Sequence, residues 1–148
     1  MNPDFVEMLS GLSAAGAEYL VVGAHALAAH GYPRATGDLD IWVRANTANA
    51  PRVLEALKRF GAPLFDLSLE DLSKPGTVFQ IGTAPARIDI LTGVSGISFE
   101  EAWPRRTTVN VGPLSVGVIG REDLIRNKRA TGSPQDLVDA DRLERHGD

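Results

Sequence analysis

The stretch that decides the fold of this 148-residue chain is residues 19–43, YLVVGAHALAAHGYPRATGDLDIWV. Its first four residues are apolar, which is typical of a short buried strand, and the strand stops at Gly23. Residues 24–30 then have the composition of a helix that ends at Gly31. After a loop, residues 38–43 alternate polar and apolar side chains, as a half-buried strand does. The stretch therefore predicts a strand, a short helix and a second strand.

The same reasoning extends to both sides of this stretch. Upstream, Asn2 and Pro3 form an N-cap and first-turn pair for a helix that ends near Gly16. Downstream, the hydrophobic spacing predicts helices over 47–60, 122–130 and 134–145, and strands over 77–81, 86–92, 109–112 and 114–119. The first two of these strands are expected to form a hairpin, and Ser133 and Asp136 have the spacing of a capping box.

Length and composition limit the classes of protein that are possible. The chain has 148 residues and 43% hydrophobic content, so we expect one domain spanning residues 1–148. The formal charge of −4 is too small to indicate a protein that coats nucleic acid. Because the sequence has no cysteine, it has no disulfide framework and no Cys-based zinc site. No stretch approaches the ~20 apolar residues of a membrane span and no signal peptide is evident, so we expect a cytoplasmic protein with no membrane partner.

Three aspartates are the main candidates for chemistry. Asp38 and Asp40 are separated by one residue on a predicted strand, so their side chains point to the same side and are costly to ionise together without a cation. Such hard oxygen ligands suit Mg²⁺. Asp89 lies in the middle of another predicted strand, RIDIL, where it either pairs with Arg87 or adds a third carboxylate to the same face. The second arrangement, which needs the two strands to be neighbours, could hold two metal ions.

The turn at Gly23 is the candidate phosphate site. A strand that runs through a glycine into a helix lets backbone N–H groups approach a phosphate closely, although a plain tight turn is the alternative. Arg34 and Thr36 lie on the loop before the acidic pair. Their guanidinium and hydroxyl groups could reach triphosphate oxygens, or they are ordinary loop residues in solvent.

The histidines and tryptophans give weaker indications. His25 and His30 are five residues apart, too far around a helix to chelate one metal ion, so packing and hydrogen bonding are the expected roles. Trp42 shares the aspartate side of its strand, where it either borders a nucleotide pocket or covers the rim of the sheet. Trp103 is expected in the core.

Three motifs in this order resemble the DNA polymerase β-like nucleotidyltransferase superfamily, most closely the small bacterial branch of AbiEii-like and MenT-like toxins. They are VGAHALAAHGYPRATGDLD at 22–40, RIDILTG at 87–93 and EDLIRNK at 122–128. The resemblance covers about residues 15–145 and implies the minimal nucleotidyltransferase fold. This is an α/β (α+β) arrangement in which helices flank a mixed, mostly antiparallel sheet. Ala24 departs from the pattern, because the superfamily often has a serine there that can donate to a phosphate oxygen.

The resemblance also implies an activity. It is the metal-dependent transfer of a nucleoside monophosphate from a nucleoside triphosphate to an acceptor hydroxyl, on an RNA or tRNA end or a protein side chain. Such an enzyme could be the toxin of a toxin–antitoxin pair, with an antitoxin as partner. The alternative is a catalytically weak or inactive nucleotide-binding or interaction module with the same fold.

The resemblance assigns residues to that activity as well. The catalytic residues, which would hold two Mg²⁺ or Mn²⁺ ions, would be Asp38, Asp40 and Asp89. The nucleotide-binding residues would be Gly23, Ala24, Arg34, Thr36 and Lys128. For Lys128 the alternative is a cation in the last turn of a helix, where the helix dipole favours it.

Overall fold

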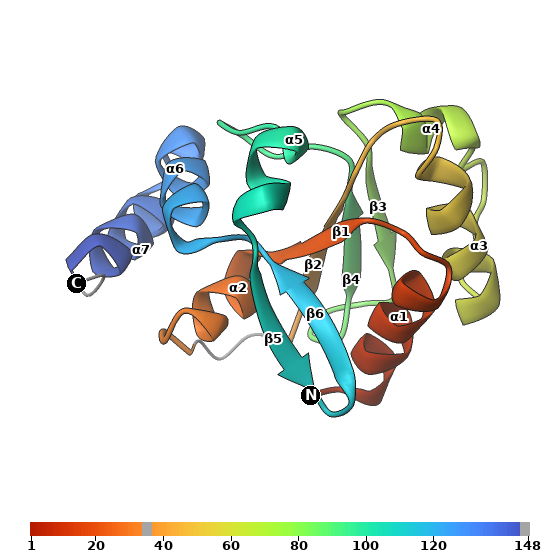
Figure 1. Ribbon diagram of the computed structural model, residues 1–148, viewed down its shortest axis with the longest axis horizontal. Coiled ribbons are helices and arrows are strands. Elements are labelled where there is room, and N and C mark those ends of the chain that lie inside the picture. Colours follow the sequence, from red (N-terminus) through yellow and green to blue (C-terminus); the bar gives the residue numbers. More distant parts are fainter. Residues whose placement is uncertain (34–36, 146–148) are drawn as a thin grey trace.

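The computed structural model describes residues 1–33 and 37–145, and a six-stranded sheet runs through its centre (Figure 1). The strands are β1 (Tyr19–Val22), β2 (Leu39–Val43), β3 (Val78–Ile81), β4 (Ile88–Leu91), β5 (Thr107–Val111) and β6 (Leu114–Val118). The helices are α1 (Pro3–Ala14), α2 (Gly23–Ala29), α3 (Ala50–Phe60), α4 (Leu69–Ser73), α5 (Phe99–Ala102), α6 (Arg121–Thr131) and α7 (Pro134–Arg145), with a 3₁₀ turn at Trp103–Arg105.

Every element expected from the sequence is present, with ends that differ by a few residues. The Asn2 side chain accepts a hydrogen bond from the backbone of Asp4 at 2.8 Å, and the Ser133 hydroxyl accepts one from the backbone of Asp136 at 3.2 Å. Two short helices were not expected, α4 and α5. Each begins with a complete capping box, Ser68 with Asp71 and Ser98 with Glu101, which is the signal that could have revealed them.

The strand order is β3-β4-β2-β1-β6-β5. Neighbours are antiparallel in the pairs β3–β4, β2–β1 and β6–β5, and parallel in β4–β2 and β1–β6. This confirms the mixed, mostly antiparallel sheet and the predicted hairpin of β3 and β4. The β2–β4 pairing joins strands that are distant in the sequence, and it decides which residues meet on the sheet.

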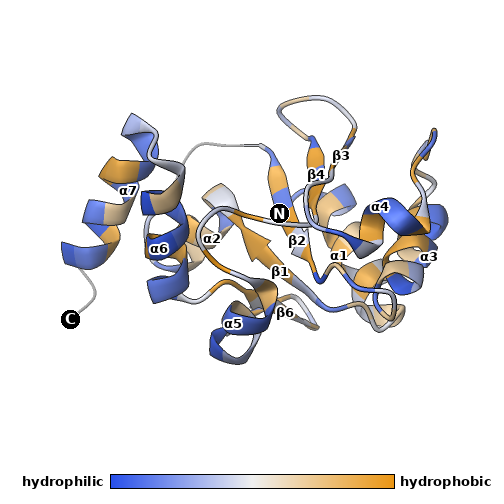
Figure 2. Ribbon diagram, turned by 90° about the horizontal axis from the view of Figure 1, so that it is seen from above, coloured by the Kyte–Doolittle hydropathy of each residue, from blue (hydrophilic) through white to orange (hydrophobic). Residues whose placement is uncertain are grey.

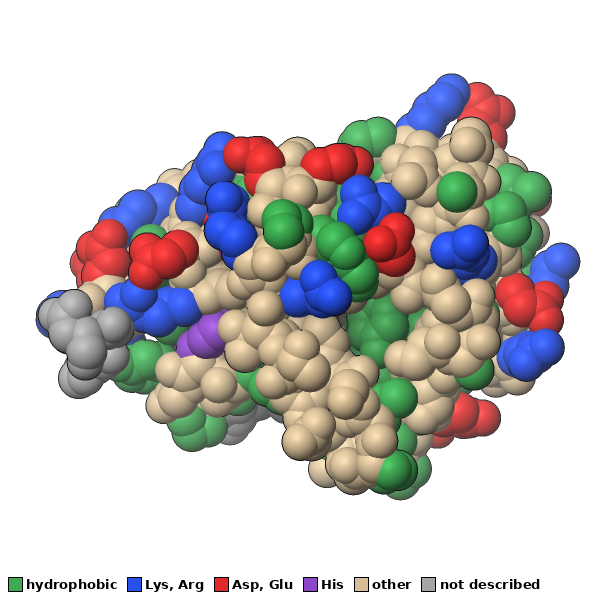
Figure 3. Space-filling model, viewed as in Figure 1, with side chains coloured by type: hydrophobic (Ala, Val, Ile, Leu, Met, Phe, Trp, Pro, Cys, Tyr) green, Lys and Arg blue, Asp and Glu red, His purple; other side chains and the backbone are tan. Residues whose placement is uncertain are grey.

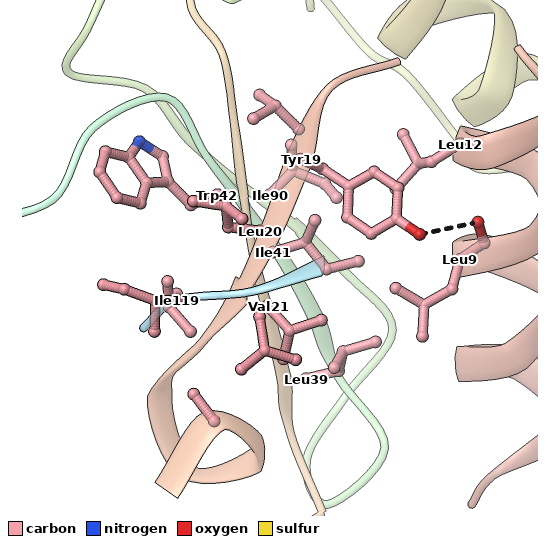
Figure 4. Close-up of a cluster of buried hydrophobic side chains, with 14 of the residues drawn as sticks. Leu9, Leu12, Tyr19, Leu20, Val21, Leu39, Ile41, Trp42, Ile90 and Ile119 are labelled. Carbon is pink, nitrogen blue, oxygen red and sulfur yellow. Dashed lines mark hydrogen bonds between the residues drawn. The ribbon is translucent and has the colours of Figure 1, made fainter. Parts of the chain in front are cut away.

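The hydrophobic core covers both faces of the sheet, and Figure 4 shows part of it. Val21 and Ile41 pair across β1 and β2 and share one face with Ile90. On that face the Tyr19 hydroxyl hydrogen-bonds the Ser13 hydroxyl at 2.8 Å and donates to the backbone carbonyl of Leu9 at 3.5 Å. These contacts fasten α1 to the first strand on this face of the sheet, whereas Asp40 lies on the opposite face.

Trp42 is on that opposite face, two residues beyond Asp40. It is 1% exposed, and its ring meets Phe99 of α5 edge-on with 5.1 Å between ring centroids. Trp42 therefore belongs to the packing under α5. Trp103 stacks on Phe99 with 5.5 Å between ring centroids. It is half-buried and packs against the core, so the expectation that it lies within the core is wrong.

The helices divide into two groups at the ends of the molecule. Figures 1 and 2 both show α6 and α7 together at one end and α1, α3 and α4 at the other. Figure 2 also shows apolar strands at the centre and hydrophilic residues on the outer turns of the helices. Within the described residues, no helix combines the length and the apolar character that crossing a membrane needs.

Candidate active site

The three predicted aspartates lie together on β2 and β4. Asp40 stands directly opposite Asp89 in the parallel register of these strands, and Asp38 immediately precedes β2 on the same side as Asp40. Asp89 is 7% exposed, whereas the other two are half-buried. The strand adjacency that the sequence analysis required is therefore present, and the three carboxylates share one face.

The guanidinium of Arg87 joins two of these carboxylates. Its Nε lies 2.8 Å from Asp89 Oδ1, and its Nη2 lies 3.3 Å from Asp89 Oδ2 and 3.3 Å from Asp38 Oδ2. The backbone N–H of Arg87 also donates to Asp38 Oδ1 at 3.2 Å. The two alternatives considered for Asp89 are thus both realised, because it pairs with Arg87 and converges with the other aspartates.

Asp40 is a carboxyl group whose ionisation is strongly perturbed. Burial, then repulsion by Asp89, a hydrogen bond with Asp89 and repulsion by Asp38 raise its pKa to about 6, with Arg87 opposing the shift. A hydrogen bond between two carboxyl groups requires a proton on one of them. The site therefore holds more negative charge than Arg87 alone offsets.

Gly23 lies against the same carboxylate. Its φ is +67°, a conformation that suits glycine, and a Cβ built on it would lie 2.3 Å from Asp40 Oδ2. The residue is thus required by the fold for a reason that the sequence did not reveal, the approach of Asp40. Ala24 follows in the first turn of α2 and is half-buried. Phosphate binding at this turn stays a prediction.

The histidines make the packing contacts that were expected. His30 Nε2 lies 2.8 Å from the backbone carbonyl oxygen of Ile119. The His25 ring meets Phe5 edge-on at 5.6 Å, and burial, followed by the nearby terminal amine, lowers its pKa. In the part of the chain that the structure describes, His25 Nε2 is buried without a hydrogen-bond partner.

Lys128 is buried between α6 and α7. Its Nζ lies 3.1 Å from Asp136 Oδ1 and 3.1 Å from Asp139 Oδ2, and Asp139 is fully buried. Thr131 donates to Asp136 at 2.6 Å and Gln135 donates to Asp139 at 3.0 Å. Lys128 lies in the last turn of α6, as the alternative to nucleotide binding has it, but its side chain is 7% exposed and pairs with two carboxylates instead of lying in solvent. Nucleotide binding by Lys128 stays a prediction.

Two of the predicted nucleotide ligands, Arg34 and Thr36, lie outside the described residues. One residue that the sequence analysis treated as a simple ion-pair partner, Arg87, is central to the site. The signal for it was its position two residues before Asp89 on a strand, which places both side chains on the same side.

The donor atoms suit a hard divalent cation, because carboxylate oxygens are the ligands that Mg²⁺ and Mn²⁺ prefer. Asp40 and Asp89 come from facing positions on adjacent strands, so they can approach one ion from two sides. Among residues 1–33 and 37–145, however, no three His, Asp or Glu side chains are already grouped as metal ligands. The chemistry of these carboxylates thus suits a metal ion, and metal binding here stays a prediction.

Comparison with known proteins supports the fold. No protein-family model and no curated protein sequence matches this chain. A solved structure of a candidate nucleotidyltransferase from Thermotoga maritima superposes with a TM-score of 0.58 at 12% identity, over 98% of this chain and 93% of that one. An antigenic nucleotidyltransferase-like protein from Paracoccidioides brasiliensis superposes with a TM-score of 0.54 at 16% identity, over 95% and 74%. The chain therefore has the fold of nucleotidyltransferase-like proteins.

Proposed function

We propose that the protein is a metal-dependent nucleotidyltransferase, which moves a nucleoside monophosphate from a nucleoside triphosphate to an acceptor hydroxyl and releases pyrophosphate. The observation that carries this proposal is the convergence of Asp38, Asp40 and Asp89 on one sheet face beside the turn at Gly23. The fold, shared with structures described as nucleotidyltransferases, supports it.

Each carboxylate has a separate task in this proposal. Asp38 and Asp40 would hold two Mg²⁺ or Mn²⁺ ions, which supply positive charge to the attacking and leaving oxygens of an in-line displacement. Asp89 would bind the ion nearer the acceptor and accept the proton of its hydroxyl. The raised pKa of Asp40 supports the assignment, because like charges held together without a cation perturb ionisation in this way.

The triphosphate would lie along the turn at Gly23 and Ala24 and the loop that carries Arg34 and Thr36. A backbone without Cβ at Gly23 leaves room for close approach, and α2 begins there with its first N–H groups free of capping by a side chain. Lys128 could join this site only by leaving at least one of its two carboxylate partners on α7.

The acceptor would be an RNA or tRNA end or a hydroxyl on a protein. On the face drawn in Figure 3, Lys and Arg side chains alternate with Asp and Glu and form no continuous basic surface. Long-range charge on that face therefore favours neither class of acceptor. A role as a toxin held in check by an antitoxin rests on the resemblance of the sequence motifs.

The test is transfer of label from each α-³²P nucleoside triphosphate, with Mg²⁺ or Mn²⁺, to total RNA or total protein. We expect one fraction to be labelled, and Asp40→Asn to reduce the rate by about three orders of magnitude or more. Asp66→Asn, an exposed aspartate outside the site, is the matched control and should transfer normally. Nucleotide binding without label in either fraction would instead identify a non-catalytic module.

A further inference from the structure

Arg87 holds the acidic site together, and its side chain and backbone are held in different ways. The backbone is part of the sheet, where its carbonyl accepts from the N–H of Leu39 at 2.9 Å and its N–H donates to Asp38 Oδ1. The guanidinium pairs with the carboxylates of Asp38 and Asp89, and the side chain is 32% exposed. The guanidinium can therefore move toward solvent without any change in the strand pairing.

The hydrogen bonds of the guanidinium use the atoms that a metal ion would need. A carboxylate oxygen that accepts an N–H has one lone pair fewer to offer, and Arg87 engages both oxygens of Asp89 and one of Asp38. A free divalent cation must break these charge-assisted bonds and enter beside a positive group. Both effects weaken metal binding while Arg87 stays where it is.

A nucleoside triphosphate provides an alternative partner for Arg87. A guanidinium matches two phosphate oxygens with the same fork that it uses for a carboxylate, and a triphosphate carries more negative charge than Asp89. Resting on the proposed function, we propose that Arg87 closes the site to free metal ions and moves to the triphosphate when the nucleotide arrives. Arg87 is thus a positioning residue that makes metal and nucleotide bind together.

The test is a titration of the whole chain with Mn²⁺ followed by electron paramagnetic resonance, which counts free ions and needs no catalysis. It is run without nucleotide and with the α,β-methylene analogues of ATP, GTP, CTP and UTP. For the natural chain we expect weak Mn²⁺ binding alone and tighter binding with one of the analogues. Arg87→Gln should bind Mn²⁺ about tenfold or more tightly in the absence of nucleotide, and should bind the analogue more weakly.

Three further variants make the result specific. Arg105→Gln is the matched control, because Arg105 forms an equivalent two-bond pair with buried Asp123 on α6, at 3.0 and 2.7 Å. It should bind Mn²⁺ as the natural chain does. Adding Asp40→Asn to Arg87→Gln should abolish the gain, which assigns the ion to this site. Arg87→Lys, which keeps the charge but not the fork, should fall between the two and serves if the glutamine variant misfolds by circular dichroism.

Two outcomes overturn the inference, and they are distinguishable. If Arg87→Gln and the natural chain bind Mn²⁺ equally without nucleotide, Arg87 does not exclude metal ions, although the proposed function stands. If none of the variants binds Mn²⁺ with any analogue, the proposed function fails as well.

Discussion

Two clusters of charged side chains in this molecule have similar composition and opposite character. On the sheet, three carboxylates lie together with one guanidinium, which pairs with Asp38 and Asp89 only, and the pKa of Asp40 is raised to about 6. Between α6 and α7, two carboxylates share the ammonium of Lys128 and receive further hydrogen bonds from Thr131 and Gln135. Burial alone would raise the pKa of Asp136, but hydrogen bonds from Thr131, Lys128 and Ser133 lower it.

The difference separates a cluster that stabilises the fold from one that the fold tolerates. In the helical cluster each buried charge has partners that offset its burial, so removing one partner is destabilising. In the sheet cluster negative charge is in excess, so removing one carboxylate relieves repulsion. Sites that bind charged ligands are commonly arranged in the second way, at a cost in stability. The variants below test this contrast, from the largest expected effect to the smallest.

The largest effect is expected for Lys128→Met, which removes the ammonium group that pairs with fully buried Asp139. We expect a loss of about 3–5 kcal/mol in the free energy of unfolding, measured by urea denaturation. The double variant Lys128→Met with Asp139→Asn should recover part of this loss, because the buried negative charge is removed together with the ammonium group. A loss below about 1 kcal/mol in the single variant, the range of a solvent-exposed pair, would show that the helical cluster does not stabilise the fold.

The next effect is expected at the glycine beside Asp40. Gly23→Ala strains a backbone with φ of +67° and places a methyl group against the Asp40 carboxylate. We therefore expect it to lower the free energy of unfolding by about 2–4 kcal/mol. Gly31→Ala is the matched control, because Gly31 has φ of +100° but nothing within 4 Å of the added Cβ. It should cost about 1–2 kcal/mol, from the backbone alone. Equal losses in urea denaturation would mean that Asp40 moves aside freely.

A smaller effect of opposite sign is expected for Asp40→Asn without metal. A carboxyl group whose pKa is higher in the folded chain than in the unfolded chain stabilises the fold below the unfolded pKa, and this contribution is lost as pH rises through the folded pKa. The natural chain should therefore lose stability between about pH 4 and pH 6. At pH 7 the variant should be more stable by about 1–2 kcal/mol after allowance for solvent screening, and its pH profile over that window should be flatter.

Thermal unfolding across this pH range is the measurement for Asp40→Asn. A variant that is strongly destabilised at pH 7 would identify Asp40 as a structural ion-pair partner, and its assignment as a metal ligand would then be withdrawn.

The smallest effect is expected for an ion pair in solvent, which sets the scale for the other three. Arg59 Nε lies 2.8 Å from Glu55 Oε1 one turn earlier on α3, and the side chain of Arg59 is 69% exposed. Arg59→Gln should change the free energy of unfolding by about 0.5 kcal/mol or less, and less still in high salt. A change as large as that of Lys128→Met would mean that burial is not what distinguishes the two pairs.

The alternation of side chains along a strand was sufficient to predict those parts of the site that lie within a single strand. The alternation of residues 38–43 placed Asp38 and Asp40 on one side, and the same alternation placed Arg87 with Asp89. The sequence could predict that Asp40 and Asp89 lie together only on the condition that their strands pair. These strands are not consecutive in the chain, and they pair in parallel. The structure supplies that pairing.

The contacts between packed helices could not be predicted from the sequence. Lys128 and Asp139 meet because α6 and α7 cross with these residues facing each other, and nothing in either helix alone indicates it. The contact between Gly23 and the Asp40 carboxylate is similarly a tertiary feature, set by the pairing of Val22 with Asp40. Both could be found only after the elements were assembled.

The strand order has a consequence for the way the protein is made. β1 leaves the ribosome before both of its neighbours in the sheet, which are β2, following soon after, and β6, following much later. Once residues up to β4 have emerged, the four strands β3-β4-β2-β1 and all three aspartates are available. Until β6 arrives, β1 is an edge strand with unpaired backbone groups, and such edges invite pairing with other chains. The pairing of β1 with β6 then covers this edge of the strands that carry the acidic site.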